Sequence, residues 1–204
     1  MNAIAKLHEK RVHGRRVDSL LRNLKELIPE NSSVLDVGCG DGLLASLIQE
    51  QVSGSKIQGI DVLMRPETKI PIAAFDGTTI PLQDNSVDVV MMVDVLHHTD
   101  DPEILIREAK RVASKWFVIK DHTRNGLLAY WTLRFMDWVG NAHHGVALPY
   151  NYLSKEEWHR LFERNEMPIE TWNPKLDIYA MPADLVFGRS LHFCARLDVS
   201  EVRG

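Results

Sequence analysis

The stretch Val34-Leu35-Asp36-Val37-Gly38-Cys39-Gly40-Asp41-Gly42 decides the fold, because a short apolar run leads there into a turn rich in glycine. Apolar residues at helical spacing follow it, so the stretch predicts a buried strand, a tight turn and a helix. Glycines in such a turn permit positive φ and let a ligand approach the backbone. The Gly-x-Gly-x-Gly spacing does not identify the ligand, since dinucleotide-binding turns look alike.

Strands and helices alternate on both sides of this turn. Strands are predicted at residues 33–37, 56–61, 71–75, 87–93 and 115–119, with helices at 42–51 and from Asp101 onward. This alternation indicates parallel strands joined by right-handed crossovers, with helices on both faces. Residues 167–197 predict two more strands around an irregular linker, and we expect the C-terminal strand to run antiparallel. The predicted fold class is α/β, with a single Rossmann-like, doubly wound, mostly parallel sheet.

Three segments lie outside the alternation. Residues 4–28 predict a helix, and we expect residues 1–29 to form a helical cap. Residues 122–153 predict a helical insertion over the edge of the sheet, and Ser154–Glu157 has the pattern of a capping box that opens another helix. The insertion has apolar residues at helical spacing, which either pack in the core or line a ligand pocket: Leu128, Trp131, Phe135 and Trp138. We expect one domain over residues 1–204.

Composition excludes several classes of protein. The chain has 204 residues, of which 45% are hydrophobic, and its 24 basic and 28 acidic residues give a net charge of −4. Without a concentrated basic face, a nucleic-acid partner is not expected. No apolar stretch approaches the ~18 residues of a membrane span, and we see no signal peptide. The two cysteines, Cys39 and Cys194, cannot form a disulfide framework. We therefore expect a cytoplasmic protein.

Two carboxylates in the glycine-rich turn indicate which ligand it binds. Asp36 ends the strand and Asp41 lies inside the turn, where a dinucleotide would place its pyrophosphate. Each close contact between a carboxylate and a phosphate would be repulsive by roughly 1 kcal/mol or more. S-adenosylmethionine (SAM) has no phosphate and carries a sulfonium and an ammonium group, so an acidic turn suits it. Asp41 alternatively caps the helix that begins at Leu43.

Three further strand ends deliver an acid to the same edge of the sheet. Asp61 ends the second strand, where it could accept hydrogen bonds from both ribose hydroxyls. Asp76, in Phe75-Asp76-Gly77, could accept from the adenine amino group, and Asp94 closes the strand at 87–93. Asp61 and Asp76 could each instead be turn formers.

These motifs together resemble the class I SAM-dependent methyltransferases. The resemblance rests on Val34–Gly42, Gly59-Ile60-Asp61, Phe75-Asp76-Gly77 and the segment Leu82–Pro102, and it covers about residues 30–120. The chain looks most like the type 11 subgroup, which includes the quinone-biosynthesis C-methyltransferases. The resemblance implies SAM as the cofactor. It also implies a set of cofactor-binding positions, namely Asp36, Gly38, Cys39, Gly40, Asp61, Val62, Asp76, Gly77 and Asp94. Cys39 is otherwise a small packing residue.

Histidines are the candidates for acceptor chemistry. His97 and His98 follow the fourth strand at the ligand-binding edge, and His143-His144 lie in a loop that could fold over it. We list His97, His98 and His144 as catalytic candidates, because a histidine could deprotonate the acceptor. A metal site and solvated or structural histidines are the alternatives, and we predict no metal.

The predicted reaction is transfer of a methyl group to a small, partly apolar molecule, with the O-, N- or C-acceptor left open. Residues 122–153, with His97 and His98, would wall the acceptor pocket. Two alternatives compete with this interpretation: a non-catalytic module that binds SAM or a nucleoside, and a nicotinamide-dependent oxidoreductase.

Overall fold

A computed structural model describes residues 3–141, 150–188 and 190–200 of the chain. Its helices are α1 (Ala3–Lys25), α2 (Leu43–Gln51), α3 (Pro102–Val112), α4 (Ala129–Asn141), α5 (Lys155–Arg164) and α6 (Asp184–Phe187), with a short 3₁₀ helix, η1 (Leu96–His98). Its strands are β1 (Ser33–Val37), β2 (Lys56–Asp61), β3 (Ile72–Ala74), β4 (Val87–Val93), β5 (Ala113–His122), β6 (Ile169–Asn173) and β7 (His192–Asp198).

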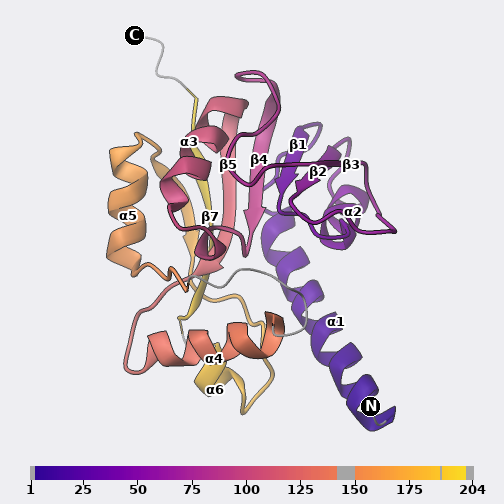
Figure 1. Ribbon diagram of the computed structural model, residues 1–204, viewed down its shortest axis with the longest axis vertical. Coiled ribbons are helices and arrows are strands. Elements are labelled where there is room, and N and C mark those ends of the chain that lie inside the picture. The colour runs from indigo at the N-terminus through magenta and orange to yellow at the C-terminus, as the bar shows by residue number, and fades with distance from the viewer. Residues whose placement is uncertain (1–2, 142–149, 189, 201–204) are drawn as a thin grey trace.

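The strands form one sheet in the order β3-β2-β1-β4-β5-β7-β6 (Figure 1). The first five strands pair in parallel, and β7 pairs antiparallel with both β5 and β6. This arrangement confirms the predicted mostly parallel sheet with an antiparallel C-terminal strand. Because β1 and β4 are neighbours while β2 lies on the far side of β1, the chain reverses direction across the sheet at the carboxyl ends of β1 and β4. Open α/β sheets bind their ligands at such a point.

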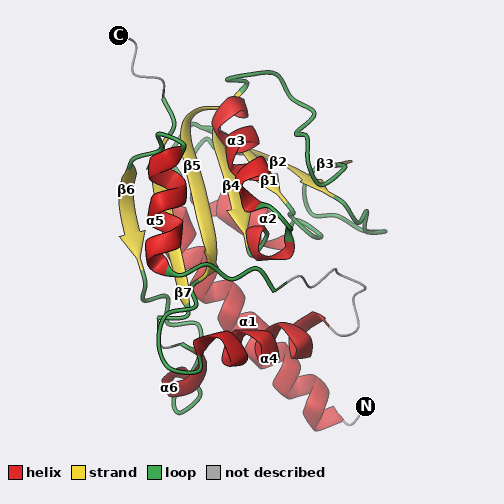
Figure 2. Ribbon diagram, turned by 60° about the vertical axis from the view of Figure 1, so that its left-hand side comes forward, coloured by secondary structure: helices red, strands yellow, loops and turns green. Residues whose placement is uncertain are grey.

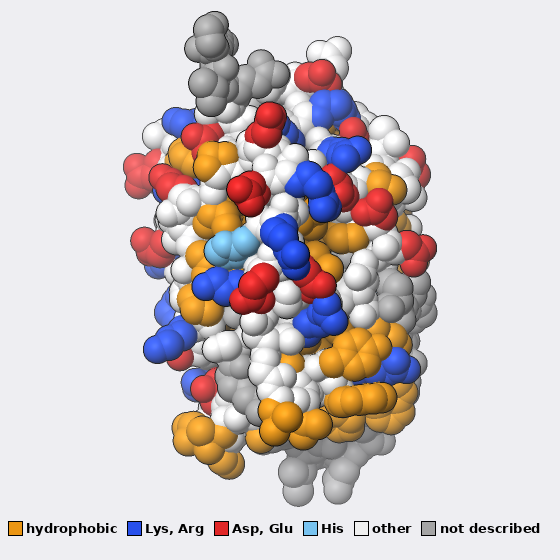
Figure 3. Space-filling view, turned by 90° about the vertical axis from the view of Figure 1, so that its left-hand side faces the viewer, with side chains coloured by type: hydrophobic (Ala, Val, Ile, Leu, Met, Phe, Trp, Pro, Cys, Tyr) orange, Lys and Arg blue, Asp and Glu red, His pale blue; other side chains and the backbone are white. Residues whose placement is uncertain are grey.

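Helix α4 lies beyond the carboxyl ends of the strands, beside α6 (Figure 2). The predicted helix of the insertion is confirmed, but its aromatic stripe does not enter the core. Trp131, Phe135 and Trp138 are 65%, 54% and 59% exposed. Hydrophobic side chains gather at this end of the molecule in the space-filling view (Figure 3). Helix α4 is anchored by its opposite face, where Ala129 and Leu133 are buried in a small cluster of their own.

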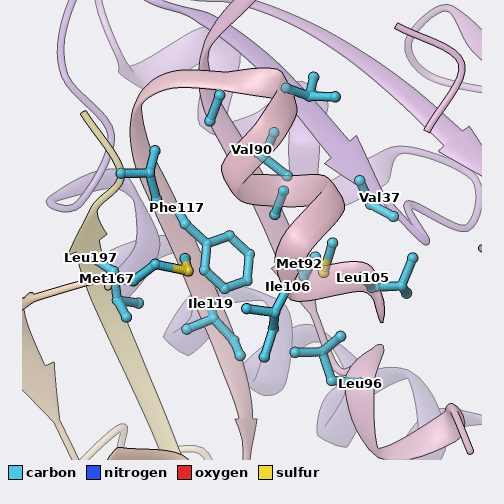
Figure 4. Packing of buried hydrophobic residues seen from close by; sticks show 14 of the residues in the cluster. Val37, Val90, Met92, Leu96, Leu105, Ile106, Phe117, Ile119, Met167 and Leu197 are labelled. Atoms are coloured by element: carbon cyan, nitrogen blue, oxygen red, sulfur yellow. The ribbon is translucent and has the colours of Figure 1, made fainter. Parts of the chain in front are cut away.

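Alternating side chains of the central strands feed two larger cores, one on each face of the sheet. On one face, Val90 and Phe117 pack with Leu105 and Ile106 of α3 (Figure 4), and the same core includes Leu35 and residues of α5. On the other face, Val34 and Val89 pack with residues of α1 and α2. Strands buried on both faces explain why the predicted strand at 87–93 reads as a nearly continuous apolar run.

Local signals set the helix boundaries. The Asp101 side chain accepts a hydrogen bond from Glu103 N and Pro102 occupies the first turn of α3, while the capping box of Ser154 and Glu157 is formed at α5. Several element boundaries differ slightly from prediction, and the largest differences are at the carboxyl ends of α1 and β5. Helix α1 ends at Lys25, three residues early, and β5 continues to His122, well past the predicted end at residue 119. The extension arises because residues 120–122 pair with β7. No helix within the described ranges is both long and apolar enough to cross a membrane.

Candidate active site

The three glycines of the β1–α2 turn all have positive φ, but their surroundings differ. A Cβ atom on Gly38 would lie 2.6 Å from Val95, and one on Gly42 would lie 2.5 Å from Ile70. A Cβ atom on Gly40 would meet no atom within 4 Å. Gly38 and Gly42 therefore let the turn pack closely, whereas Gly40 faces open space that a ligand could occupy.

That space belongs to a cavity of about 620 Å³ at the carboxyl ends of β1, β2 and β4. This volume lies within the range of small-molecule sites. Seven of the predicted site residues line the cavity: Gly38, Gly40, Asp61, Val62, Gly77, Asp94 and His98. The lining also includes Phe75, Val95, Ile104 and Leu105, which add an apolar wall. The structure thus brings together one site from strand ends that are far apart in the sequence.

Asp61 joins the ends of β1 and β2. Its Oδ2 accepts a hydrogen bond from Gly40 N at 2.7 Å, and its Oδ1 accepts from Leu63 N at 2.8 Å. One carboxylate thereby fixes the turn and lies on the cavity wall. Each of its oxygens has more than one lone pair, so it can still accept from a hydroxyl group of a ligand.

Asp36 lies below the turn and does not line the cavity. Burial, with a smaller contribution from the neighbouring Asp61 charge, raises the pKa of Asp36 to about 8. The carboxyl is therefore largely protonated at neutral pH until a positive charge arrives above it. Cys39 also lies outside the cavity lining. Burial and the charges of Asp36 and Asp61 raise the pKa of its thiol to about 12, which suits a packing residue and opposes a nucleophile.

Two acids form turns: Asp41 of the glycine-rich turn and Asp76 of the predicted cofactor-binding set. Asp41 Oδ1 accepts at 3.0 Å from the backbone N of Leu43, the first residue of α2, whose N-cap position is Gly42. Asp76 Oδ1 accepts from Thr78 N and Thr79 N, both at 2.7 Å, so its carboxylate shapes the loop after β3. Gly77, the neighbour of Asp76, is the residue that reaches the cavity wall.

Asp94 is paired with two cations. It follows β4 with a φ of 57°, a left-handed conformation that Asp tolerates better than most residues. Arg16 of α1 contacts its Oδ2 at 2.6 Å, and the buried Lys120 of β5 contacts its Oδ1. Burial alone would raise the pKa of Asp94, but Lys120 and Arg16 hold it well below its usual value. The contact with Arg16 also brings the described C-terminal part of α1 to the edge of the site.

A buried histidine–carboxylate cluster lies next to Asp94. His97 Nδ1 donates to Asp121 Oδ1 at 2.6 Å, and Asp121 Oδ2 accepts from Leu96 N at 3.0 Å. His122 lies with its Nδ1 3.4 Å from His97 Nδ1. Burial would raise the pKa of Asp121, but His97 and His122 lower it, while burial and Lys120 lower the pKa of His122. At neutral pH this predicts an ionised Asp121 beside a neutral His122.

Sequence reasoning missed Lys120, Asp121 and His122, because the predicted strand stopped at residue 119, and it also missed His192, the first residue of β7. The one available signal was the unusual run Lys-Asp-His directly after an apolar strand. Lys120 Nζ lies 3.4 Å from His192 Nδ1, and His192 Nε2 lies 3.1 Å from Phe187 O, so the polar contacts extend from Asp94 to the segment before β7.

The side chains of Asp94, His97, Asp121 and His122 each offer a ligand atom, and these atoms lie within 4.8 Å of one another. A metal ion could bind such a set of ligand atoms, but the two carboxylates already have partners. Asp94 contacts the two cations Arg16 and Lys120, and Asp121 accepts from His97 at 2.6 Å, the length of a charge-assisted hydrogen bond. A divalent ion would add two positive charges without a compensating anion among the described residues. No metal remains our prediction.

His97 and His98 have different positions. His98 lines the cavity, whereas His97 is 2% exposed and lies behind it, with the two ring centroids 4.0 Å apart. Tyr152 lies 5.9 Å from the His97 ring and connects this cluster to the insertion. No described residue of the range 122–153 lines the cavity itself. His143 and His144 lie outside the described residues.

Comparisons with known proteins identify the family of the chain. A family model described as a methyltransferase domain matches residues 8–167. Among curated proteins, a ubiquinone biosynthesis O-methyltransferase of Sodalis glossinidius is 29% identical over 109 residues, 48% of this chain and 42% of that protein. An uncharacterized methyltransferase of Mycobacterium sp. (strain KMS) is 31% identical over 131 residues, 61% of this chain and 46% of that protein. The chain thus matches less than half the length of these relatives.

Solved structures share the fold. The methyltransferase in a complex with the Trm112 activator from Haloferax volcanii has a TM-score of 0.71 at 14% identity, covering 97% of this chain and 95% of that one. A SAM-dependent methyltransferase from Mesorhizobium loti has a TM-score of 0.67 at 18% identity, covering 89% and 99% of the two chains.

Proposed function

Because this chain belongs to the methyltransferase-domain family, we propose that it transfers the methyl group of SAM to a hydroxyl oxygen of a small, partly apolar molecule. The methyl donor follows from the family and the class I fold. The acceptor is the proposal. Its hydroxyl group is suggested by the O-methyltransferases among the curated relatives and by the histidine on the cavity wall. Its partial apolarity is suggested by Phe75, Val95 and Leu105, which line the same cavity.

One observation carries the assignment of the cofactor site: Gly40 faces open space directly beside the Asp61 carboxylate. We assign the methionine part of SAM to Gly38 and Gly40, with Asp61 at the ribose. We assign the adenine to Val62 and Gly77, with Asp76 shaping the loop there. Asp94 supplies negative charge beside the methionine part, Asp36 would ionise below it when cationic SAM binds, and Cys39 supports the turn.

SAM supplies an already activated methyl group, so the contribution of the protein is alignment and the exclusion of water. His98 is the residue that takes the hydroxyl proton, since it lines the cavity close to Asp94. His97 positions the ring of His98 by direct contact, and Asp121 fixes His97 through the 2.6 Å hydrogen bond. A base with a pKa near the working pH contributes typically 10²–10⁴-fold to the rate.

We also propose that residues 122–153 cover the acceptor side, with Tyr152 as the described link between the insertion and His97. His144 remains a catalytic candidate on the basis of the sequence. Residues 1–29 would act as a cap through Arg16, within a single domain. We expect a cytoplasmic protein without a nucleic-acid partner. A non-catalytic SAM-binding module is the competing function.

The proposal is tested by methyl transfer from labelled SAM to hydroxylated aromatic acceptors, with two single variants. His98→Ala is expected to lower kcat by about a hundredfold or more and to leave the Kd for SAM within about a factor of two, since the contact acts mainly in the transition state. His159→Ala is the matched control, because His159 lies on α5 against Trp172, away from the cavity. Wild-type turnover in His98→Ala would refute the assignment of the base. Absence of transfer to every acceptor, with intact SAM binding, would favour the non-catalytic module.

A further inference from the structure

One end of the molecule carries a set of exposed apolar side chains, none of which lines the cavity of the candidate active site. We call it the apolar cap. It consists of Leu128, Trp131, Phe135 and Trp138 at α4, with Met181 and Leu185 at α6, and each of these side chains is more than half exposed. Helices α4 and α6 contact each other, and both lie at the same end of the molecule in two views (Figures 1 and 2).

The spacing of residues along α4 determines that the apolar cap faces outward. Leu128, Trp131, Phe135 and Trp138 recur at intervals of three or four residues, so they form one stripe along the helix. Ala129 and Leu133 lie on the opposite side and are buried with Tyr152 and Leu191. Rotating α4 to hide the stripe would expose this buried cluster. The stripe therefore stays on the surface of the folded domain.

The composition of the cap points to a particular kind of partner. Three aromatic and three aliphatic side chains at these exposures present roughly 800 Å² of surface, more than the largest apolar patch of a typical soluble monomer. This area is also about what each subunit of a standard protein dimer buries, so the composition of the cap, and not its area, selects the partner. Two of the six side chains are tryptophans, which are enriched where a bilayer meets water.

Cations lie on α4 and beside the segment that leads to α6, although the whole chain is acidic and α6 itself begins with Asp184. The one charged side chain described on α4 is Arg134, which is exposed and whose guanidinium lies 4.4 Å from the Tyr150 ring centroid. Arg15 of α1 donates to Tyr179 O, in the segment that leads to α6. Cations close to an apolar, tryptophan-bearing face are typical of proteins that lie on a membrane surface.

From these observations we propose that the apolar cap docks this domain on the surface of a lipid bilayer containing anionic lipids. The cap inserts its side chains among the lipid headgroups without spanning the membrane. Tyr130 of α4 contacts Tyr152, and Tyr152 contacts His97, so docking would turn the active-site end toward the lipid. A partly apolar acceptor would then enter the site from the bilayer, and this corollary rests on the proposed function. The docking itself does not rest on the proposed function.

The test uses the full chain and sedimentation with vesicles of phosphatidylcholine and phosphatidylglycerol. The wild-type protein is expected to sediment with the vesicles. Trp131→Ser combined with Phe135→Ser is expected to lower the partition coefficient by at least about tenfold, since each buried aromatic side chain contributes strongly to transfer from water. Met64→Ser is the control, because Met64 is also about half exposed but lies after β2, outside the cap. Failure of the wild type to bind, or equal losses in the double variant and the control, would overturn the proposal.

A second measurement does not depend on a variant that folds. Vesicles with brominated lipids are expected to quench part of the tryptophan emission of the wild-type protein, because Trp131 and Trp138 would lie within the bilayer surface. Light scattering tests whether a second copy of the chain covers the apolar cap instead of lipid. A wild-type dimer that Trp131→Ser converts to a monomer would assign the apolar cap to that second copy and overturn the lipid proposal. Neither result bears on SAM binding, so docking and the proposed function can fail separately.

Discussion

At the scale of single residues, substitutions of two glycines in the β1–α2 turn should affect different properties, one the affinity for SAM and the other the stability of the fold. Gly40→Ala places a methyl group in the open cradle, so it should weaken SAM binding by tenfold or more, on the order of 1.4 kcal/mol. Gly42→Ala places the methyl group against Ile70 and should lower the free energy of unfolding by about 2 kcal/mol or more, since left-handed strain and overpacking add. Titration calorimetry and denaturant unfolding of both variants check the pair. Equal effects of the two substitutions on both quantities would contradict the cradle.

Asp36 predicts a pH dependence. Because burial raises its pKa to about 8, the folded protein holds a proton that the unfolded chain releases near pH 4, and the free energy of unfolding falls as the pH rises through this window. Cationic SAM favours the ionised carboxylate. The affinity for SAM should therefore rise with pH below about 8, by up to about tenfold per unit, and level off above it.

Asp36→Asn is the control for this prediction, because the amide cannot ionise. The slope of affinity against pH should flatten in the variant, as measured by calorimetry in buffers of different ionisation enthalpy, which also counts the released proton. The same slope in Asp36→Asn and the wild type would show that another group, such as the ligand's own amine, causes the dependence.

At the scale of elements, the capping box of α5 offers a clean test of local structure. Ser154→Ala removes the hydrogen bond that Glu157 N donates to the hydroxyl group, and it should lower the free energy of unfolding by about 1 kcal/mol. The exposed Ser53 provides the comparison, and Ser53→Ala should change stability by less than about 0.5 kcal/mol. Urea unfolding distinguishes them. A Ser154→Ala protein as stable as the Ser53→Ala protein would mean that packing alone holds α5.

Strand β5 shows where prediction from the sequence stops. The apolar residues Trp116–Ile119 predict the strand, but Lys120, Asp121 and His122 are polar and break the pattern. They stay in the strand because β7 pairs with them and because Asp94 and His97 provide their partners. These partners are distant in the sequence, so no local pattern can reveal them.

Helix α4 shows the converse case. Its spacing predicts a helix, and the helix is there, but spacing does not say which side of a helix meets the domain. The cluster of Ala129, Leu133, Tyr152 and Leu191 determines that, and it leaves the larger aromatic side chains outside.

At the scale of the whole molecule, the fold and the edge of the sheet that holds the cofactor could be predicted, because every parallel strand follows the same rule. Each parallel strand ends in residues that meet at one edge, so Gly38, Asp61, Gly77 and Asp94 come together wherever the strand order is right. The acceptor side follows no such rule, because it depends on the packing of α4, the antiparallel strands and their loops.

We also predict that the site as a whole needs no metal ion. Treatment with a chelator, followed by dialysis, should leave methyl transfer and the melting temperature unchanged, since Arg16 and Lys120 already pair with Asp94, and His97 already donates to Asp121. Lost activity that one divalent ion restores would instead place a metal among Asp94, His97, Asp121 and His122.

The central claim is that the cavity at the carboxyl ends of the strands binds SAM, and titration calorimetry of the chain tests it most directly. SAM should bind at one site per chain and NAD should not bind, because the acidic turn disfavours a pyrophosphate. Asp61→Ala should weaken SAM binding by roughly 1.5–3 kcal/mol, the scale of hydrogen bonds to a charged group. Binding of NAD at this site in preference to SAM, or an unchanged affinity for SAM in Asp61→Ala, would contradict the account.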